Sequence, residues 1–297
     1  MRRRRRHRMI AFALSGLAFG LLAVWIAGGW MMRPRATAVP AAHGSARDFH
    51  MLTQDGVTLD ATYRASAGPR APAVLLLHGV GASREAVAPM AAWLAKQGYA
   101  TLSIDFRGHG ESTARPRSFG WHEAGDAHAA FSWLRRRHPG ARIAVIGISM
   151  GGAASLIGPR GPLPADGLIL QAVYPDIRHA IRNRMVSRLG SWPAAVMEPL
   201  LSLQAWPRIG VWPDAIAPVR AISRFQAPVM VIGGAEDVYT PPEETRVLYD
   251  AAPSKRVLWI VANGDHAKIS SLSDDVYRAK VLRFLADTIG AASAFDG

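Results

Sequence analysis

Between residues 73 and 288 the chain alternates short, almost purely apolar runs with longer stretches of helical spacing. The apolar runs are rich in Val, Ile and Leu with little polar alternation, which is typical of strands buried on both faces of a parallel sheet. This alternation predicts an α/β fold with a doubly wound, mostly parallel sheet. The expected strands are Ala73–Leu77, Tyr99–Ile104, Ile143–Ile146, Gly167–Gln171, Val229–Ile232 and Val257–Val261, and the expected helices are 84–97, 121–137, 150–157, 241–251 and 274–288.

Two segments depart from this alternation. A hairpin is expected before the sheet, over 47–53 and 57–63, because Asp55-Gly56 is a strong turn signal between its arms. More than fifty residues separate Gln171 from Val229, which is far more than one crossover helix needs. We interpret about 174–224, with its three tryptophans, as a small cap inserted over the C-terminal edge of the sheet; one ordinary helix with loops is the alternative.

The N-terminus has the composition of a membrane anchor. Six arginines within residues 2–8 precede an uncharged stretch from Met9 to Met32. About 20 residues suffice for a helix to cross a hydrocarbon core of ~30 Å. The excess of arginine before the span predicts a cytoplasmic N-terminus and a body outside, in the periplasm or the extracellular space. The lipid bilayer is therefore an expected partner of residues 9–32.

A cleaved signal peptide is the alternative, because Ala36-Thr37-Ala38 has the form of a cleavage site and the body would then be secreted. The apolar region exceeds the usual signal length, which favours the uncleaved anchor. The expected organisation is a cytoplasmic arginine cluster and transmembrane anchor over 1–35, a linker over 36–46, and the α/β domain over 47–297.

Charge and cysteine content exclude several functions. The net charge is +13, but eight arginines lie within residues 1–35 and leave 27 basic and 22 acidic residues elsewhere. No basic run interleaved with aromatic residues remains, so nucleic acid is not an expected partner. The chain has no cysteine, which excludes disulfides, thiolate metal sites and a cysteine nucleophile.

One serine stands at the end of a predicted buried strand. Ser149 lies in Gly147-Ile148-Ser149-Met150-Gly151, after an apolar run and before a helix start rich in small residues. A G-x-S-x-G turn between strand and helix holds the serine hydroxyl clear of the sheet, and its glycines allow the backbone to reverse sharply. Ser149 is therefore the predicted nucleophile.

A serine hydroxyl needs a base, and His266 is the expected one. It lies in Asn263-Gly264-Asp265-His266, directly after the last predicted strand. The other nine histidines lie in the N-terminal tail, in segments before the sheet, in loops that shape the backbone, or in helices and the cap, and we expect them to be structural.

Asp237 is the expected acid that orients the histidine. It follows the strand Val229–Ile232, and the order Ser149, Asp237, His266 fits this architecture. Asp176, after the preceding strand, and the adjacent Glu236 are the competing acids. Asp265 is expected to cap its loop.

The tetrahedral intermediate requires two backbone donors. The N–H of Met150, directly after the nucleophile, is one candidate. The N–H of Val80, in the glycine-containing loop His78-Gly79-Val80-Gly81, is the other.

Four stretches together resemble the α/β-hydrolase superfamily, in particular its lysophospholipase-like and serine-aminopeptidase-like members. They are HGVGAS at 78–83, DFRGHGES at 105–112, GISMGG at 147–152, and GGAEDVYTPP at 233–242 with GDH at 264–266. The resemblance covers about residues 50–290. It implies hydrolysis of an ester or related acyl bond without a metal or organic cofactor, and it implies structural roles for Asp105, Arg107 and Ser112.

The expected function is therefore that of a membrane-anchored serine hydrolase with a small acyl ester as substrate. A peptidase or amidase, a thioesterase, and a non-catalytic binding protein on the same fold are the alternatives. The sequence does not determine the oligomeric state.

Overall fold

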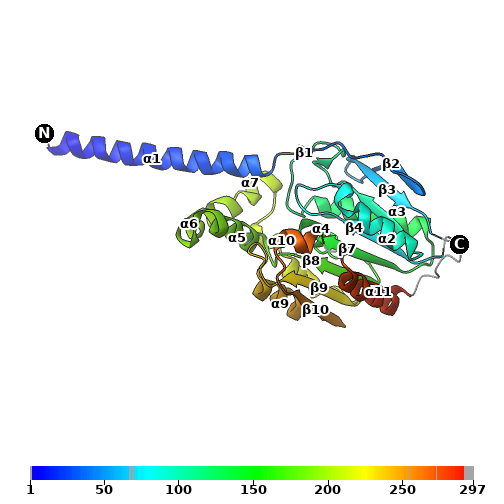
Figure 1. Cartoon of the computed structure of the whole chain (residues 1–297). Coiled ribbons are helices and arrows are strands. Elements are labelled where there is room, and N and C mark those ends of the chain that lie inside the picture. Colours follow the sequence, from blue (N-terminus) through cyan, green and yellow to red (C-terminus); the bar gives the residue numbers. More distant parts are fainter. Residues whose placement is uncertain (1, 67, 69, 254, 272, 291–297) are drawn as a thin grey trace.

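A computed structural model describes residues 2–66, 68, 70–253, 255–271 and 273–290. Its centre is an eight-stranded sheet with helices on both faces (Figure 1). The strand order is β10-β9-β8-β7-β4-β5-β3-β2. The strands are β2 (Ala46–Leu52), β3 (Thr58–Arg64), β4 (Ala73–Leu77), β5 (Ala100–Ile104), β7 (Ile143–Ile148), β8 (Gly167–Gln171), β9 (Val229–Gly234) and β10 (Arg256–Val261).

The sheet is mostly parallel. Strands β4, β5 and β7 to β10 pair in parallel, while β3 runs antiparallel to both β2 and β5. The chain builds the sheet outward in one direction from β4 to β5 and in the other from β7 to β10. The order reverses between β4 and β7, and in open α/β sheets ligands bind beyond the carboxyl ends of the strands at such a point. The predicted fold class and hairpin are confirmed.

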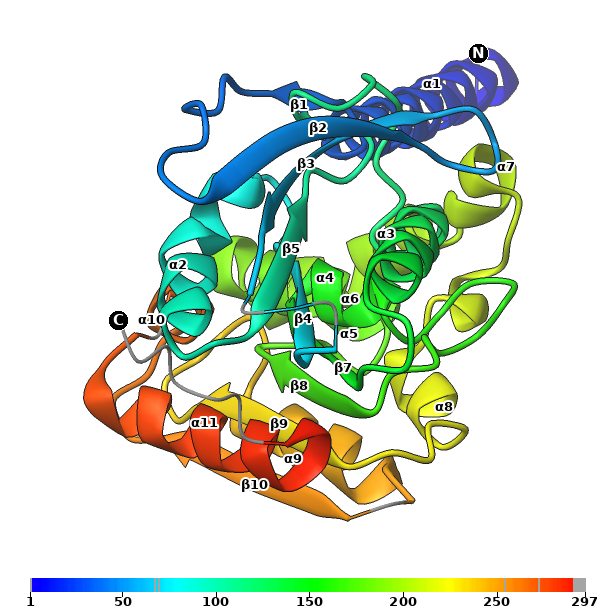
Figure 2. The ribbon, with the colours of Figure 1, turned by 90° about the vertical axis from the view of Figure 1, so that its right-hand side faces the viewer.

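Apolar side chains on the two faces of each strand pack against different helices. In β4, Val74 and Leu76 join one buried cluster, and Leu75 and Leu77 join the other. The first cluster includes side chains of α2 (Ala88–Lys96) and α11 (Asp275–Ile289), and the second includes those of α3 (Glu123–Arg137), α8 (Pro218–Ile222) and α9 (Pro242–Ala251). Figure 2 shows α2 and α3 on opposite sides of the sheet. Burial on both faces explains why the strands lack polar alternation.

The long segment between β8 and β9 is helical. It contains α5 (Ile177–Leu189), α6 (Ser191–Ser202), α7 (Ala205–Ile209), a short 3-10 turn (Pro213–Ala215) and α8. Gly190, at φ 85°, joins α5 to α6 in a sharp corner. We call α5, α6 and α7 the cap.

The chain enters the fold through a long helix, α1 (Arg2–Met31), which projects from the body (Figure 1). Within the described residues it is the one helix long and apolar enough to cross a membrane, and its most apolar window is not buried in the protein. Directly after it, β1 (Arg35–Ala36) pairs in parallel with β6 (His109–Gly110). The segment expected as a linker therefore begins with hydrogen bonds to the body, and the Ala42 N–H donates to Asp48 further on.

Candidate active site

Ser149 occupies a strained turn between β7 and α4 (Met150–Ala154). Its φ of 48° and ψ of −114° lie in a backbone region that residues other than glycine rarely adopt, and the residue is buried. A β-carbon added to Gly147 would lie 2.5 Å from the Cα of Gly152, and one added to Gly151 would lie 2.6 Å from the His78 carbonyl oxygen. The turn therefore requires glycine on both sides of Ser149, as the spacing of the motif predicts.

Asp237 and His266 meet at the same edge of the sheet. Asp237 follows β9, and His266 begins α10 (His266–Ser270) beyond the end of β10. The Nδ1 of His266 lies 2.8 Å from Oδ2 of Asp237. With Asp237 ionised, Nδ1 carries the proton and donates it to the carboxylate, which leaves Nε2 as the basic nitrogen.

The environment of Asp237 keeps it ionised. Burial by itself would raise the pKa of Asp237, but the hydrogen bond from His266 and those from Thr240 outweigh it, so the pKa lies below its ordinary value. Its Oδ1 accepts from the backbone N–H groups of Tyr239 and Thr240, at 2.8 and 2.9 Å. The hydroxyl of Thr240 donates to Oδ2 at 2.6 Å. A carboxylate held by four donors is fixed in position as well as in charge.

The three other acids have different positions. Glu236 is exposed. Asp176 accepts from the backbone N–H of His179 at the start of α5 and contacts the His179 ring at 2.8 Å. Asp265 accepts from the backbone N–H of Lys268 at the start of α10. Of the four acids weighed from the sequence, Asp237 is the one bonded to the His266 ring.

The loop that carries Val80 passes beside Ser149. A β-carbon added to Gly79 would lie 3.6 Å from Cβ of Ser149. The carbonyl of Gly79 accepts from Nδ1 of His78 at 2.8 Å, while Nε2 of His78 accepts from the Phe106 N–H at 3.1 Å. Because a trans peptide is planar, fixing the Gly79 carbonyl also fixes the opposite direction for the Val80 N–H.

The DFRGHGES segment forms a buried polar network. Arg107 binds the carboxylate of Asp126 through Nε and Nη2 and that of Asp55 through Nη1 and Nη2. Burial opposes the charge of Arg107, but these carboxylates outweigh it and raise the pKa of Arg107 above its usual value. Asp105 binds Arg84, and the hydroxyl of Ser112 donates to the Asp105 carbonyl. These contacts tie the segment 105–112 to α3, to Asp55 in the turn between β2 and β3, and to Arg84.

Thr240 and Tyr239 belong to the site but were not identified from the sequence. The Tyr239 ring meets the His266 ring edge to face, with centroids 5.4 Å apart. A signal for Thr240 was present, because an Asp followed three residues later by Thr is a common local hydrogen-bonded turn.

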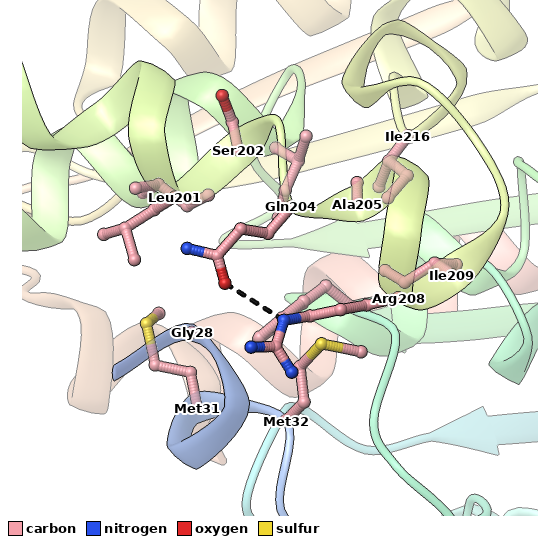
Figure 3. A pocket seen from close by; sticks show the side chains of 13 residues that line it. Gly28, Met31, Met32, Leu201, Ser202, Gln204, Ala205, Arg208, Ile209 and Ile216 are labelled. Atoms are coloured by element: carbon pink, nitrogen blue, oxygen red, sulfur yellow. Dashed lines mark hydrogen bonds between the residues drawn. The ribbon is translucent and has the colours of Figure 1, made fainter. Parts of the chain in front are cut away.

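A separate apolar pocket lies between the end of α1 and the cap (Figure 3). Met31 and Met32 line it from α1 and the residue after it, and Leu201 and Ile209 line it from α6 and α7. Ser149, Asp237 and His266 are not among its lining residues. Within the described part of the chain, no group of three His, Asp or Glu residues could hold a metal ion.

Comparison with known proteins identifies relatives along most of the chain. A family model described as "Serine aminopeptidase, S33" matches residues 68–218. The chain is 30% identical over 262 residues to the uncharacterized protein Rv2307c of Mycobacterium tuberculosis, covering 86% of this chain and 85% of that protein. It is 30% identical over 194 residues to the uncharacterized protein YqkD of Bacillus subtilis, covering 63% of this chain and 62% of that protein.

Solved structures share the fold. An esterase of Pyrococcus furiosus superposes with a TM-score of 0.68 at 22% identity, over 87% of this chain and 99% of that chain. An esterase of Exiguobacterium antarcticum superposes with a TM-score of 0.56 at 17% identity, over 80% of this chain and 97% of that chain.

Proposed function

This chain belongs to the serine aminopeptidase S33 family of the α/β-hydrolase superfamily, and we propose that it is a membrane-anchored serine hydrolase that cleaves carboxylic esters. The observation that carries the proposal is the hydrogen bond between His266 and Asp237, at the sheet edge where Ser149 stands on its strained turn. Two of the structural neighbours are esterases, which favours an ester over other acyl bonds.

In the proposed reaction, Ser149 Oγ attacks the carbonyl carbon of the ester and its proton passes to Nε2 of His266. Asp237 stabilises the imidazolium that forms. The N–H groups of Met150 and Val80 hold the negative oxygen of the tetrahedral intermediate. Collapse breaks the bond to the alcohol, which leaves with the proton from His266. A water molecule, deprotonated by the same ring, then hydrolyses the acyl-enzyme and restores Ser149.

Hydrolysis of short p-nitrophenyl esters by the full-length protein in detergent tests the assignment. We expect Ser149→Ala to lower kcat by about 10³-fold or more, because the nucleophile is lost. Ser155→Ala is the matched control, since it removes a buried hydroxyl that donates to the Gly152 carbonyl in the same segment. A fluorophosphonate probe should label the wild type and the control but not Ser149→Ala. Undiminished turnover by Ser149→Ala would refute the mechanism.

The anchoring part of the proposal rests on the length, apolarity and exposure of α1. By the positive-inside rule, the arginines at its start favour an N-terminus in the cytoplasm and a catalytic body outside. After a carbonate wash we expect the full-length chain in the membrane pellet. Release of a mature chain that begins near Val39 would instead support a cleaved signal peptide.

An aminopeptidase is the second candidate, because the matching family model carries that description. The same three residues could cleave an amide if His266 protonates the leaving amine. Assays of aminoacyl-anilides and esters in parallel decide between the two, since a larger kcat/KM on the anilides would reject esters as the preferred class.

A further inference from the structure

One face of α6 is apolar and yet exposed. Trp192, Val196 and Leu200 recur every four residues, and their exposed fractions are 78%, 50% and 37%. Leu203, three residues further on, is 43% exposed. Such apolar spacing is typical of a helix that packs against a partner, but no described part of the chain covers this face.

No exposed charged side chain on α6 balances this apolar face. Glu198 is its one charged residue, and its side chain turns toward Arg178 of α5, with 16% exposed. The apolar face continues onto α7 through Trp206, which is 52% exposed and stacks on Trp212 with ring centroids 5.2 Å apart. We call Trp192, Val196, Leu200, Leu203 and Trp206 the cap stripe.

The cap is joined to α1 well inside the uncharged span. Nε2 of Gln204 donates to the Val24 carbonyl at 3.1 Å. The guanidinium of Arg208 donates to the Trp25 carbonyl at 2.6 Å and lies 3.9 Å from the centre of the Trp25 ring. Gly28 makes this approach possible, because a β-carbon there would overlap the Gln204 side chain. Figure 3 shows Gln204 and Arg208, bonded to each other, facing the end of α1.

These contacts set the depth of the cap relative to a bilayer. The uncharged span Met9–Met32 measures ~36 Å as a helix, and Val24 lies ~12 Å from its outer end. A hydrocarbon core of ~30 Å centred on the span would therefore reach past Val24 toward the cap. Figure 1 shows that α5 and α6 extend beyond the end of the sheet, on the side toward the N-terminal end of α1.

We propose that the bilayer crossed by α1 also covers the cap stripe, so that the cap lies in the outer leaflet, between the interface and the outer part of the hydrocarbon. The inference rests on the membrane anchoring proposed above. Tryptophan side chains favour this interface, where an apolar ring and a polar N–H are both accommodated. On neighbouring α5, Arg182 and Arg188 are exposed and can reach lipid phosphates. An apolar face with basic side chains beside it is typical of helices that lie in a membrane surface.

The absence of cysteine from the chain permits a direct test with single-cysteine variants of the full-length protein. Val196→Cys and Trp192→Cys report on the cap stripe. Leu17→Cys, in the middle of α1, reports on the anchor. Val276→Cys is the control, because Val276 is 57% exposed on α11. Each variant is labelled with a nitrobenzoxadiazole fluorophore and reconstituted in nanodiscs of phosphatidylcholine and phosphatidylglycerol, which leave both membrane faces accessible.

Two quenchers locate each label: a doxyl group on the lipid acyl chains, and iodide in the water. We expect labels at 192, 196 and 17 to be quenched by the doxyl lipid and to resist iodide severalfold better than the label at 276. If the labels at 192 and 196 respond to iodide like that at 276 while the label at 17 is quenched by lipid, α1 spans the bilayer and the inference is wrong.

The remaining outcomes are also decisive. Protection of the stripe labels from iodide without quenching by lipid would mean that a protein chain, such as a second copy, covers the stripe, and would overturn the inference. Lack of lipid quenching at 17 would overturn the anchoring itself, and the inference with it.

Discussion

Thr240 donates two hydrogen bonds to the carboxylate of Asp237, from its backbone N–H to Oδ1 and from its hydroxyl to Oδ2. The hydroxyl therefore shares Oδ2 with the Nδ1 of His266, and it lies 3.5 Å from that nitrogen. Thr240 thus helps to hold the carboxylate in position against the imidazole. In the proposed mechanism it is a positioning residue, which acts on the reaction through Asp237.

Thr240→Val keeps the shape of the side chain and removes the hydroxyl. We expect kcat on p-nitrophenyl esters to fall about tenfold to a hundredfold, because a hydrogen bond to a charged group contributes about 1.5–3 kcal/mol. The loss should deepen at acid pH, since a carboxylate with fewer donors takes up a proton more readily. Thr240→Ser should recover most of the activity. Thr288→Val, which removes a buried hydroxyl from α11, should leave kcat and its pH profile unchanged.

Replacement of the acid tests its assignment. Asp237→Asn should lower kcat by about 10⁴-fold with the fold intact, because an amide no longer fixes the required tautomer of His266. Asp176→Asn and Glu236→Gln are the controls, and each should retain nearly full activity. If Asp176→Asn proves as damaging as Asp237→Asn, the acid of the proposed triad has been assigned to the wrong residue.

The turn around Ser149 should tolerate no side chain at Gly151. A β-carbon there would meet the carbonyl oxygens of Leu77 and His78, which are backbone atoms and cannot rotate away. We expect Gly151→Ala to lower the free energy of unfolding by about 1–3 kcal/mol or more. Gly68→Ala is the control, because no atom lies within 4 Å of the position that its β-carbon would take. Equal melting temperatures for the two variants would contradict this account.

The buried imidazole of His78 should make the protein less stable in acid. Burial, with a smaller contribution from His109, lowers the pKa of His78 from 6.5 to about 3. Between these values the unfolded chain binds a proton at this position and the folded chain does not. The contribution of His78 to the free energy of unfolding is therefore fully present above pH 6.5. It falls by about 1.4 kcal/mol for each pH unit below that value.

His78→Asn should reduce this dependence. From pH 7 to pH 5, the wild type in detergent should lose about 2 kcal/mol more than the variant, measured by urea unfolding. His43→Asn, which replaces an exposed histidine, should behave like the wild type. A His78→Asn protein with the pH dependence of the wild type would exclude His78 as the source.

The fold could be predicted from local patterns because burial on both faces leaves a strand such as β4 with no polar residue. The turn over residues 147–151 could also be predicted, because its requirement for small residues is local. In the structure Ser149, Asp237 and His266 follow β7, β9 and β10, whose carboxyl ends share one edge; their catalytic roles remain predictions.

Other features depend on contacts between distant segments. Gln204 and Val24 are 180 residues apart, and no periodicity in α1 or around the start of α7 indicates that they meet. The sequence also could not place the exposed side of α6, because its apolar residues are numerous enough to suggest ordinary packing. Only the arrangement of the cap against α1 shows which of them are left uncovered.

The pairing of Arg35 and Ala36 with β6 follows α1 almost at once, with the Arg35 N–H bound to Gly108 and the Thr37 N–H to Gly110. Such an attachment leaves little freedom of movement between α1 and the body. Under the proposed anchoring, a body held in this way would keep a constant height and tilt relative to the membrane. Its encounters with substrate would then be governed by diffusion in two dimensions, which favours esters that travel in the same leaflet over those dissolved in the surrounding fluid.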